Sequence, residues 1–431
     1  MRDRFSSNAL GRMGRRGFLK TLAGLGVSAS TASALTQSAV AEAVDDPRRE
    51  VPRIRAFKHT NHEEVVEEGS KPEREPDVYT IPRWRWARIE AAHDARRRIE
   101  HQLNSEYPVW VTTDNNGEKK VVVEQPDDGN LRSADVRALD KKVPASMKGV
   151  AGRRSRSGRR SRFAQEREIP VDIERPKAEP SMSREMQDGY GIETNHGVDM
   201  SNHLYWDDWN DNIPGGAACQ LNLDRGIEAV GTLCTPVVAK DGTRQMVTAG
   251  HNITIPQSNS LSTNSISGSV PEGQADFTPD QEEATGSAGP EVFDAAALNT
   301  TNGSGVHYEF ATQNESTTDM IWGTALQDRL NDIEDNGTRS NETFVRKGAR
   351  TGSNEGFGID EVGSNGFRPS LDENQTDRGD SGGPYYLRVD LPYIDWKVSY
   401  VAGVHQGDSG LYPTTVATSM YRVEERFEVT V

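Results

Sequence analysis

GDSGGP at residues 379–384 is the most informative stretch of this sequence. A serine between glycines, here Ser381, fits a tight turn that leaves its hydroxyl exposed. The backbone N–H groups of Gly379 and Ser381 can then point at one position and hold an oxyanion there. The stretch therefore indicates acyl transfer, with Ser381 as the nucleophile.

Two motifs upstream supply the partners that a serine nucleophile needs. TAGH at residues 248–251 places His251 after an apolar strand, and FDAAAL at residues 293–298 supplies Asp294. A histidine can take the serine's proton near neutral pH, and a carboxylate can fix the tautomer of the imidazole. Histidine, aspartate and serine follow one another at intervals of 43 and 87 residues.

With these motifs in this order, residues 185–431 resemble the chymotrypsin-like (trypsin-like) serine proteases, nearer to the bacterial-type and glutamyl endopeptidase members. The resemblance implies an all-β fold of two six-stranded antiparallel Greek-key barrels, with His251 and Asp294 from the first, Ser381 from the second and the active site between them. It favours Asp294 over the alternative acid Asp319, because the family frames its aspartate with apolar residues. It also implies a serine endopeptidase that acts on proteins or peptides without a cofactor or metal.

The rest of residues 181–431 agrees with an all-β domain. Short strand-like segments such as 230–238 and 245–248 are separated by turn residues, and no long amphipathic helix is predicted. The run 255–290, rich in Ser, Asn and Glu, is predicted to form surface loops between the base and the acid.

Three other interpretations compete with the protease. The GxSxG pattern also fits an α/β-hydrolase, but that fold needs its acid and histidine after the serine, and only 50 residues follow Ser381. A non-catalytic binding protein on the same scaffold and an esterase on the same scaffold both remain open. Labelling of the serine and a comparison of peptide with ester turnover distinguish them.

The expected specificity rests on residues near the nucleophile. Trypsin-like members place an aspartate six residues before the serine, where this chain has Gln375, so a preference for Lys or Arg is not expected. GVHQG at residues 403–407 resembles a stretch of the glutamyl endopeptidases, which implies that His405 and Thr376 contact an acidic side chain, with Arg378 adding positive charge. Cleavage after Glu, or less often Asp, is the hypothesis; the alternative is that His405 only packs in the second barrel.

The first 43 residues predict an export signal. RRGFLK at residues 15–20 precedes a mildly apolar stretch and two small-x-small cleavage candidates within residues 39–43. The pattern predicts a twin-arginine signal, a secreted protein and the twin-arginine export machinery as a partner. No stretch reaches the roughly 20 apolar residues of a membrane span.

Residues 44–180 are predicted to be a pro-region and basic linker. Residues 84–103 predict a helix, and strands at 107–113 and 119–124 around the turn 114–117 predict a hairpin. The resemblance implies that this small α+β unit assists folding and occupies the active site of a zymogen; a separate binding module is the alternative. Residues 148–162 hold seven basic and no acidic residues and predict an exposed linker rather than a nucleic-acid tail.

Charge separates the two parts of the chain. Residues 181–431 hold 15 basic and 38 acidic residues, while residues 1–180 hold 35 and 28, which gives net charges of −23 and +7. Salt screens the self-repulsion of such an acidic surface, so the domain is predicted to be adapted to high salt. The two cysteines, Cys219 and Cys234, are predicted to form a disulfide in the exported protein, with two buried thiols as the alternative.

Overall fold

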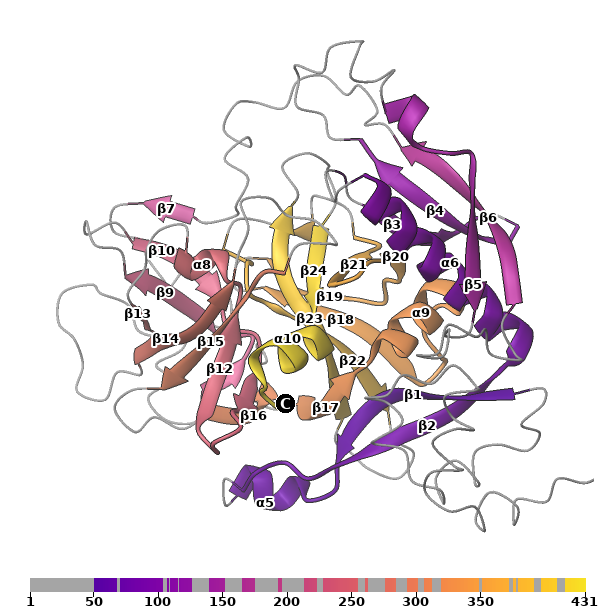
Figure 1. Cartoon of the computed structure of the whole chain (residues 1–431). Coiled ribbons are helices and arrows are strands. Elements are labelled where there is room, and N and C mark those ends of the chain that lie inside the picture. Colours follow the sequence, from indigo (N-terminus) through magenta and orange to yellow (C-terminus); the bar gives the residue numbers. More distant parts are fainter. Residues whose placement is uncertain are drawn as a thin grey trace, which may run out of the picture. The chain divides into compact units, whose positions relative to one another are not determined.

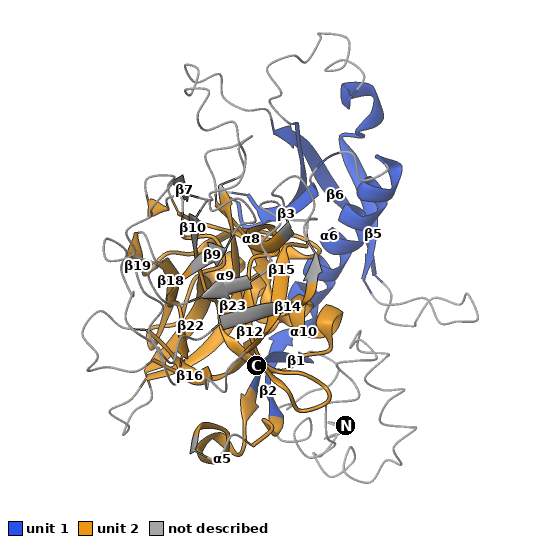
Figure 2. Cartoon of the chain, turned by 90° about the vertical axis from the view of Figure 1, so that its left-hand side faces the viewer, with its two compact units in different colours: residues 1–57, 75–176 blue, residues 58–74, 177–431 orange. Residues whose placement is uncertain are grey.

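The computed structural model describes a defined part of the 431-residue chain. The described residues are 50–67, 70–103, 107, 109–114, 116–125, 139–151, 165–174, 193–195, 213–222, 228–254, 260–262, 276–283, 293–300, 306–311, 319–348, 351–371, 375–376, 379–390, 397–408 and 415–431. They fall into two compact units, shown in Figure 2: residues 1–57 with 75–176, and residues 58–74 with 177–431. The predicted signal, most of the predicted basic linker and Arg378 lie outside the described residues.

The first unit is a helix packed on a small sheet. Its elements are β1 (Glu50–His59), β2 (Arg74–Pro82), α6 (Arg83–Gln102), β3 (Val109–Thr113), β4 (Lys119–Glu124), β5 (Ser146–Ala151) and β6 (Gln165–Glu174). The strands are ordered β3-β4-β6-β5, with β4 and β6 parallel and the other neighbours antiparallel. The predicted helix and hairpin are confirmed within one or two residues of their expected bounds.

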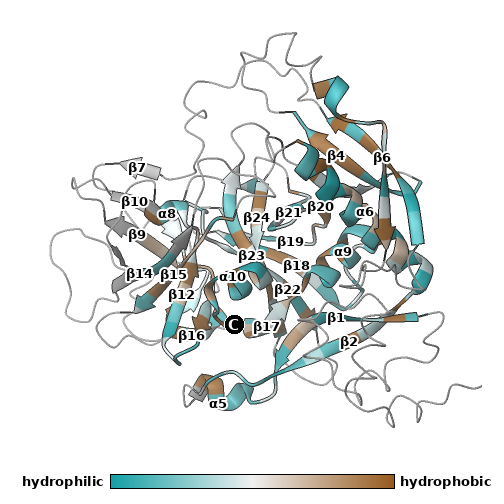
Figure 3. Ribbon diagram, viewed as in Figure 1, coloured by the Kyte–Doolittle hydropathy of each residue, from teal (hydrophilic) through white to brown (hydrophobic). Residues whose placement is uncertain are grey.

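Helix α6 buries an alanine-rich face against the sheet. Ala91, Ala92, Ala95 and Ile99 pack with valines of β3 and β4 in one core cluster, and Figure 3 shows hydrophobic stretches along β4 and β6. Small side chains allow the close approach. A Cβ at Gly149 of β5 would lie 1.8 Å from the carbonyl oxygen of Ala91.

One boundary of the predicted linker was wrong. Residues 148–151, predicted to be exposed and flexible, belong to β5. Gly149 lets this strand lie directly on α6, and Ala151 is fully buried. The charge of Lys148 does not prevent the strand from packing, because the lysine side chain stays in solvent. Glu166 is its ion-pair partner there.

The second unit is built mainly of strands in two groups, drawn in pink and brown and in orange and yellow in Figure 1. The first group is a sheet ordered β11-β12-β15-β14-β13-β9-β10-β7. Its strands are β7 (Glu193–Asn195), β9 (Ala218–Asn222), β10 (Glu228–Thr232), β11 (Pro236–Val238), β12 (Arg244–Thr248), β13 (Ser260–Ser262), β14 (Asp276–Glu283) and β15 (Ala295–Thr300).

The second group contains the order β19-β18-β22-β23-β24-β21-β20, with β17 beside β23 and β16 between β17 and β8. Its strands are β8 (Ile213–Gly215), β16 (Val306–Phe310), β17 (Asp319–Ala325), β18 (Glu342–Gly348), β19 (Gly352–Glu355), β20 (Ile359–Val362), β21 (Gly366–Pro369), β22 (Pro384–Asp390), β23 (Lys397–Asp408) and β24 (Thr415–Ser419). The all-β character of the unit is therefore confirmed.

The finer prediction of two six-stranded antiparallel barrels differs from these sheets. The first sheet has eight strands, and β16–β8 and β17–β23 are parallel pairs. The run 255–290, predicted to be loops, contains β13 and the whole of β14. Strand β14 forms despite its polar sequence because it pairs along the whole of β15, an apolar strand that is buried at Ala295 and Leu298.

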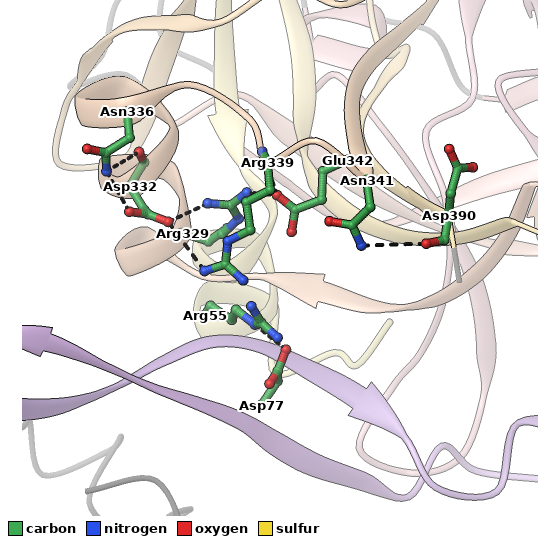
Figure 4. A network of polar contacts seen from close by, with 9 residues as sticks. All are labelled: Arg55, Asp77, Arg329, Asp332, Asn336, Arg339, Asn341, Glu342 and Asp390. Atoms are coloured by element: carbon green, nitrogen blue, oxygen red, sulfur yellow. Dashed lines mark hydrogen bonds and ion pairs between the residues drawn. The ribbon is translucent and has the colours of Figure 1, made fainter. Parts of the chain in front are cut away.

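The helices of the second unit are short. They are α5 (His62–Glu67), α8 (His251–Thr254), α9 (Gln327–Asn336) and α10 (Met420–Phe427). Helix α10 buries Met420, Val423 and Phe427, which share one face. Around α9, Arg329 bonds to Asp332 and Glu342 (Figure 4). Among the described residues, no helix is both long and apolar enough to cross a membrane.

The predicted disulfide is wrong in this structure. Cys219 and Cys234 are both free and buried. Cys219 packs with Leu233 in one core cluster, whereas Cys234 packs with Val247 in another. Consecutive residues of an extended chain point to opposite faces, so Leu233 and Cys234 cannot both face Cys219. The alternative of two buried thiols therefore holds, and burial raises the pKa of the Cys219 thiol to about 12.

Candidate functional site

The structure brings His251 and Asp294 together. Strands β12 and β15 are antiparallel neighbours with Thr248 opposite Ala296, so the residues just beyond their adjacent ends meet. Asp294 Oδ2 lies 2.6 Å from His251 Nδ1, and Asp294 Oδ1 accepts a hydrogen bond from the backbone N–H of His251 at 2.8 Å. A carboxylate only accepts, so Nδ1 carries the hydrogen and Nε2 presents its lone pair.

The second group of strands holds Asp294 in place. The hydroxyl of Thr418 on β24 donates to the carbonyl oxygen of Asp294 at 2.9 Å and accepts from its backbone N–H at 3.1 Å. Gln406 on β23 donates to the same hydroxyl at 2.9 Å. The aspartate is therefore fixed through its backbone on one side and through His251 on the other, and it is almost fully buried.

The turn that carries Ser381 is bonded to the segment that carries His251. The side-chain amide of Asn252, the residue after His251, donates to the carbonyl oxygen of Ser381 at 3.0 Å. The backbone N–H of Thr232 donates to the same oxygen at 2.8 Å. A Cβ at Gly382 would lie 2.2 Å from the hydroxyl of Thr248. These contacts place the serine turn directly against the end of β12.

Among the described residues, some hydrogen-bonding groups of Ser381 and Gly379 are left without partners. The Oγ of Ser381 is buried and makes no hydrogen bond with any described residue. The N–H groups of Gly379 and Ser381 likewise have no acceptor among the described residues. Gly379 adopts φ 97° and Gly382 φ 91°, a region that favours glycine, so both glycines of the turn are required by its conformation.

A buried ion pair braces the same turn. Arg346 on β18 bonds to Asp380, and both side chains are fully buried. The Arg346 guanidinium also donates to the Thr351 hydroxyl at 2.9 Å, to Asn354 Oδ1 at 2.7 Å and to the carbonyl oxygen of Gln375 at 2.8 Å. Arg346 thereby fixes Asp380, the residue directly before the serine.

The residues predicted to set specificity divide into three cases. His405 on β23 is buried, and its backbone bonds to Gly382 and Gly383 of the serine turn. Its Nδ1 lies 3.0 Å from the hydroxyl of Tyr385. Burial, and next the charges of Arg346 and His251, hold the pKa of His405 well below its usual range. Thr376 is buried just before the turn, and Arg378 lies outside the described residues.

Asp319, the alternative acid, is engaged elsewhere. Its Oδ2 accepts a hydrogen bond from the hydroxyl of Tyr386 at 2.7 Å and lies 3.7 Å from Arg388. It pairs opposite Lys397 where β17 meets β23. His251 is bonded to Asp294 and not to Asp319.

Sequence reasoning missed the residues that fasten the site. Thr232, Arg346 and Thr418 bond to the turn or to the aspartate, but each is one polar residue inside a strand with no motif around it. Asn252 is an exception. It could have been proposed as a site residue from the sequence, because it directly follows His251.

Similarity to known proteins is found among solved structures. A scan of protein-family models finds no match, and a search of curated proteins finds none either. Among solved structures, a Nocardiopsis protease (NAPase) is 17% identical, covers 51% of this chain and 98% of its own, and has a TM-score of 0.34. A glutamic acid-specific serine protease, titled as using a histidine triad in substrate binding, is 19% identical, with coverages of 51% and 100% and a TM-score of 0.34.

A third similar structure is the Drosophila Grass clip serine protease, 11% identical, with coverages of 57% and 70% and a TM-score of 0.28. All three are described as proteases. Likenesses at TM-scores this low do not assign the chain to a family.

Proposed function

We propose that this chain is a serine endopeptidase in which His251, Asp294 and Ser381 form the catalytic triad. The observation that carries the proposal is the 2.6 Å bond between His251 Nδ1 and Asp294, formed beside a serine turn that is hydrogen-bonded to Asn252. These hydrogen bonds link the imidazole, its carboxylate and the turn that carries the serine, which supports a Ser-His-Asp arrangement for acyl transfer.

Each step uses an atom of this chain. Nε2 of His251 takes the proton of Ser381 Oγ as the oxygen attacks the peptide carbonyl. The N–H groups of Gly379 and Ser381 stabilise the oxyanion of the tetrahedral intermediate. Asp294 stabilises the imidazolium, which then gives its proton to the leaving amine. Water, activated by the same imidazole, releases the acyl group from Ser381.

We propose a preference for Glu, and less often Asp, before the cleaved bond. His405 is bonded through its backbone to the serine turn, which supports a place beside the bound substrate. If the Tyr385 hydroxyl donates to Nδ1, the neutral imidazole keeps its hydrogen on Nε2 and can donate it to a carboxylate. Thr376 and Arg378 would add a hydroxyl and a positive charge.

Labelling with a fluorophosphonate probe tests the chemistry. The wild-type protein should gain one probe mass on the peptide that contains Ser381, and Ser381→Ala should gain none. Ser399→Ala is the matched control, because Ser399 is also buried with an Oγ that has no hydrogen-bond partner among the described residues. Absence of labelling in the wild type would favour a non-catalytic binding protein.

A substrate panel tests the reaction and the specificity. Peptides that differ only in Glu, Asp, Phe, Leu or Lys before the cleaved bond should be ranked with Glu first, and His405→Phe should abolish that ranking while leaving fluorophosphonate labelling intact. Turnover of esters without turnover of any peptide would support the esterase alternative. Fast cleavage after Phe or Leu with slow cleavage after Glu would contradict the proposed specificity.

We also propose export by the twin-arginine route, with residues 44–180 as a pro-region. The sequence RRGFLK and the contrast of charge between the two parts of the chain support this. N-terminal sequencing of secreted protein should find a start near residue 43 for the precursor and a later start for the mature form. Replacement of both arginines by lysine should retain the precursor in the cell.

A further inference from the structure

Residues 58–74 lie within the predicted pro-region, yet they belong to the second unit. The segment is the tip of a hairpin whose strands, β1 and β2, continue into the first unit on both sides. Its two ends are joined, because the backbone N–H of Thr60 donates to Glu73 at 2.8 Å. We call residues 58–74 the latch.

The latch is buried in the core of the second unit. Val65 is fully buried in a cluster with Val237, Val247 and Tyr308, although its neighbours in HEEVVEEG are acidic. The guanidinium of Arg244 donates to the carbonyl oxygen of Val65 at 2.8 Å. Burial of one valine side chain contributes roughly 1.5–3 kcal/mol to stability. Val65 therefore anchors the latch, although its neighbours in the sequence are acidic.

Contacts at three further latch residues, His59, His62 and Arg74, hold the segment in the second unit. The indole N–H of Trp322 donates to the carbonyl oxygen of His59 at 2.8 Å, and the ring of His62 stacks on Trp322 at 4.9 Å. Arg74 pairs with Glu424 of α10 at 2.5 Å. The same carboxylate accepts from the backbone N–H of Val431 at 2.9 Å. The latch is thus held by β12, β16, β17 and α10 together.

We propose that the latch holds the N-terminal unit on residues 177–431 after the chain is cut between them, and that acid releases it. The partner is the chain's own N-terminal fragment, since the latch is joined to that fragment by peptide bonds at both ends. Cleavage between the units alone would therefore not free the second unit.

The acid sensitivity follows from two facing histidines. His59 Nδ1 lies 3.4 Å from His62 Nδ1, and His59 Nε2 lies 2.8 Å from the carbonyl oxygen of Val431, to which it donates. Nδ1 of a neutral His59 is then an acceptor, and His62 donates to it. Only one hydrogen fits between the two nitrogens, so protonation of both rings sets two N–H groups against each other.

The surroundings oppose protonation as well. Desolvation by burial lowers the pKa of His59 and of His62 to about 4. Arg74 faces His59, and His307, which pairs with Glu309, faces His62. Arg244 lies over Tyr308, the ring that His59 contacts edge-on.

Because the bound pKa values lie below the free value of 6.5, binding is complete above pH 6.5 and is lost as the pH falls toward 4. Protonation of each histidine should raise the dissociation constant of the two fragments roughly 20-fold between pH 7 and pH 5.

The test cuts the chain at a chosen place. A recognition sequence for a site-specific protease is inserted within residues 177–192, after β6, so that the whole first unit stays on the N-terminal fragment. The chain carries Ser381→Ala, which excludes self-digestion, so the test does not depend on the proposed activity. After cleavage, the fragments should co-elute in size-exclusion chromatography at pH 7.5 and separate at pH 5. Separate elution at pH 7.5, or co-elution at pH 5, would overturn the proposal.

Variants of the latch locate the effect. Val65→Ser should lower co-elution at pH 7.5, and Glu63→Ser, an exposed position in the same helix, should not. His62→Phe keeps a ring on Trp322 without a titrating nitrogen, so its fragments should separate only at a lower pH than those of the parent. A His62→Phe protein that separates at the same pH as the parent, or a Val65→Ser protein that is indistinguishable from Glu63→Ser, would contradict the role of the latch.

Discussion

Replacement of Arg346 by methionine should destabilise the second unit strongly. The substitution removes the guanidinium partner of the fully buried Asp380 carboxylate, to which the hydroxyl and N–H of Thr351 still donate. Removal of one partner of a buried ion pair costs about 3–5 kcal/mol, because the other charge stays desolvated. Total stabilities are about 5–15 kcal/mol, so the variant should unfold at a much lower urea concentration.

A surface pair gives the matched control. Arg339 lies 3.7 Å from Asp332 and is 41% exposed (Figure 4). Arg339→Met should therefore cost less than about 1 kcal/mol. Urea unfolding followed by tryptophan fluorescence, in a Ser381→Ala background, measures both free energies of unfolding.

The double variant Arg346→Met/Asp380→Asn separates charge from packing. It removes both charges and keeps an acceptor for the N–H of Thr351, so it should recover more than half of the loss. A free energy of unfolding for Arg346→Met that is no lower than that of Arg339→Met would refute the reasoning. So would a double variant that is less stable than Arg346→Met alone.

Three further predictions follow from single features. Gly382→Ala should abolish labelling and activity, because its Cβ would lie 2.1 Å from the carbonyl oxygen of Thr232 at φ 91°; an active, stable Gly382→Ala enzyme would contradict the tight turn. Native protein at pH 8 should resist alkylation at Cys219 and Cys234, whereas urea-unfolded protein without reductant should take up two labels, and a disulfide would give none. Unfolding midpoints of the full chain should rise as salt is raised through the molar range, because salt screens the net charge of −23 on residues 181–431; midpoints independent of salt would argue against adaptation to high salt.

Local patterns predicted the features that depend on local chemistry. The helix near 84–103 and the hairpin around 114–117 were found because periodicity and turn residues specify them within a few positions. The contact of His251 with Asp294 was predicted from two short motifs, since each follows or precedes a buried strand.

Features that depend on contacts between residues far apart in the sequence could not be predicted from it. Strand β14 is polar and forms through pairing with β15 and β13. The ion pair between Arg346 and Asp380 joins residues 34 positions apart without a motif at Arg346. The faces of Cys219 and Cys234 depend on strand register, which shifts with a single residue. Val65 lies in an acidic hexapeptide, so its burial could not be expected from composition.

The rate at which a fluorophosphonate inactivates Ser381 tests most directly whether His251 and Asp294 activate this serine. The second-order rate constant is measured for Asp294→Asn and for Asp319→Asn, after thermal unfolding confirms that each variant is folded. Asp294→Asn should be slower than wild type by a factor on the order of 10³–10⁴, and Asp319→Asn should stay within about threefold of wild type, a difference of at most ~0.7 kcal/mol in barrier. Equal rates for Asp294→Asn and wild type, or a greater loss in Asp319→Asn, would contradict the account.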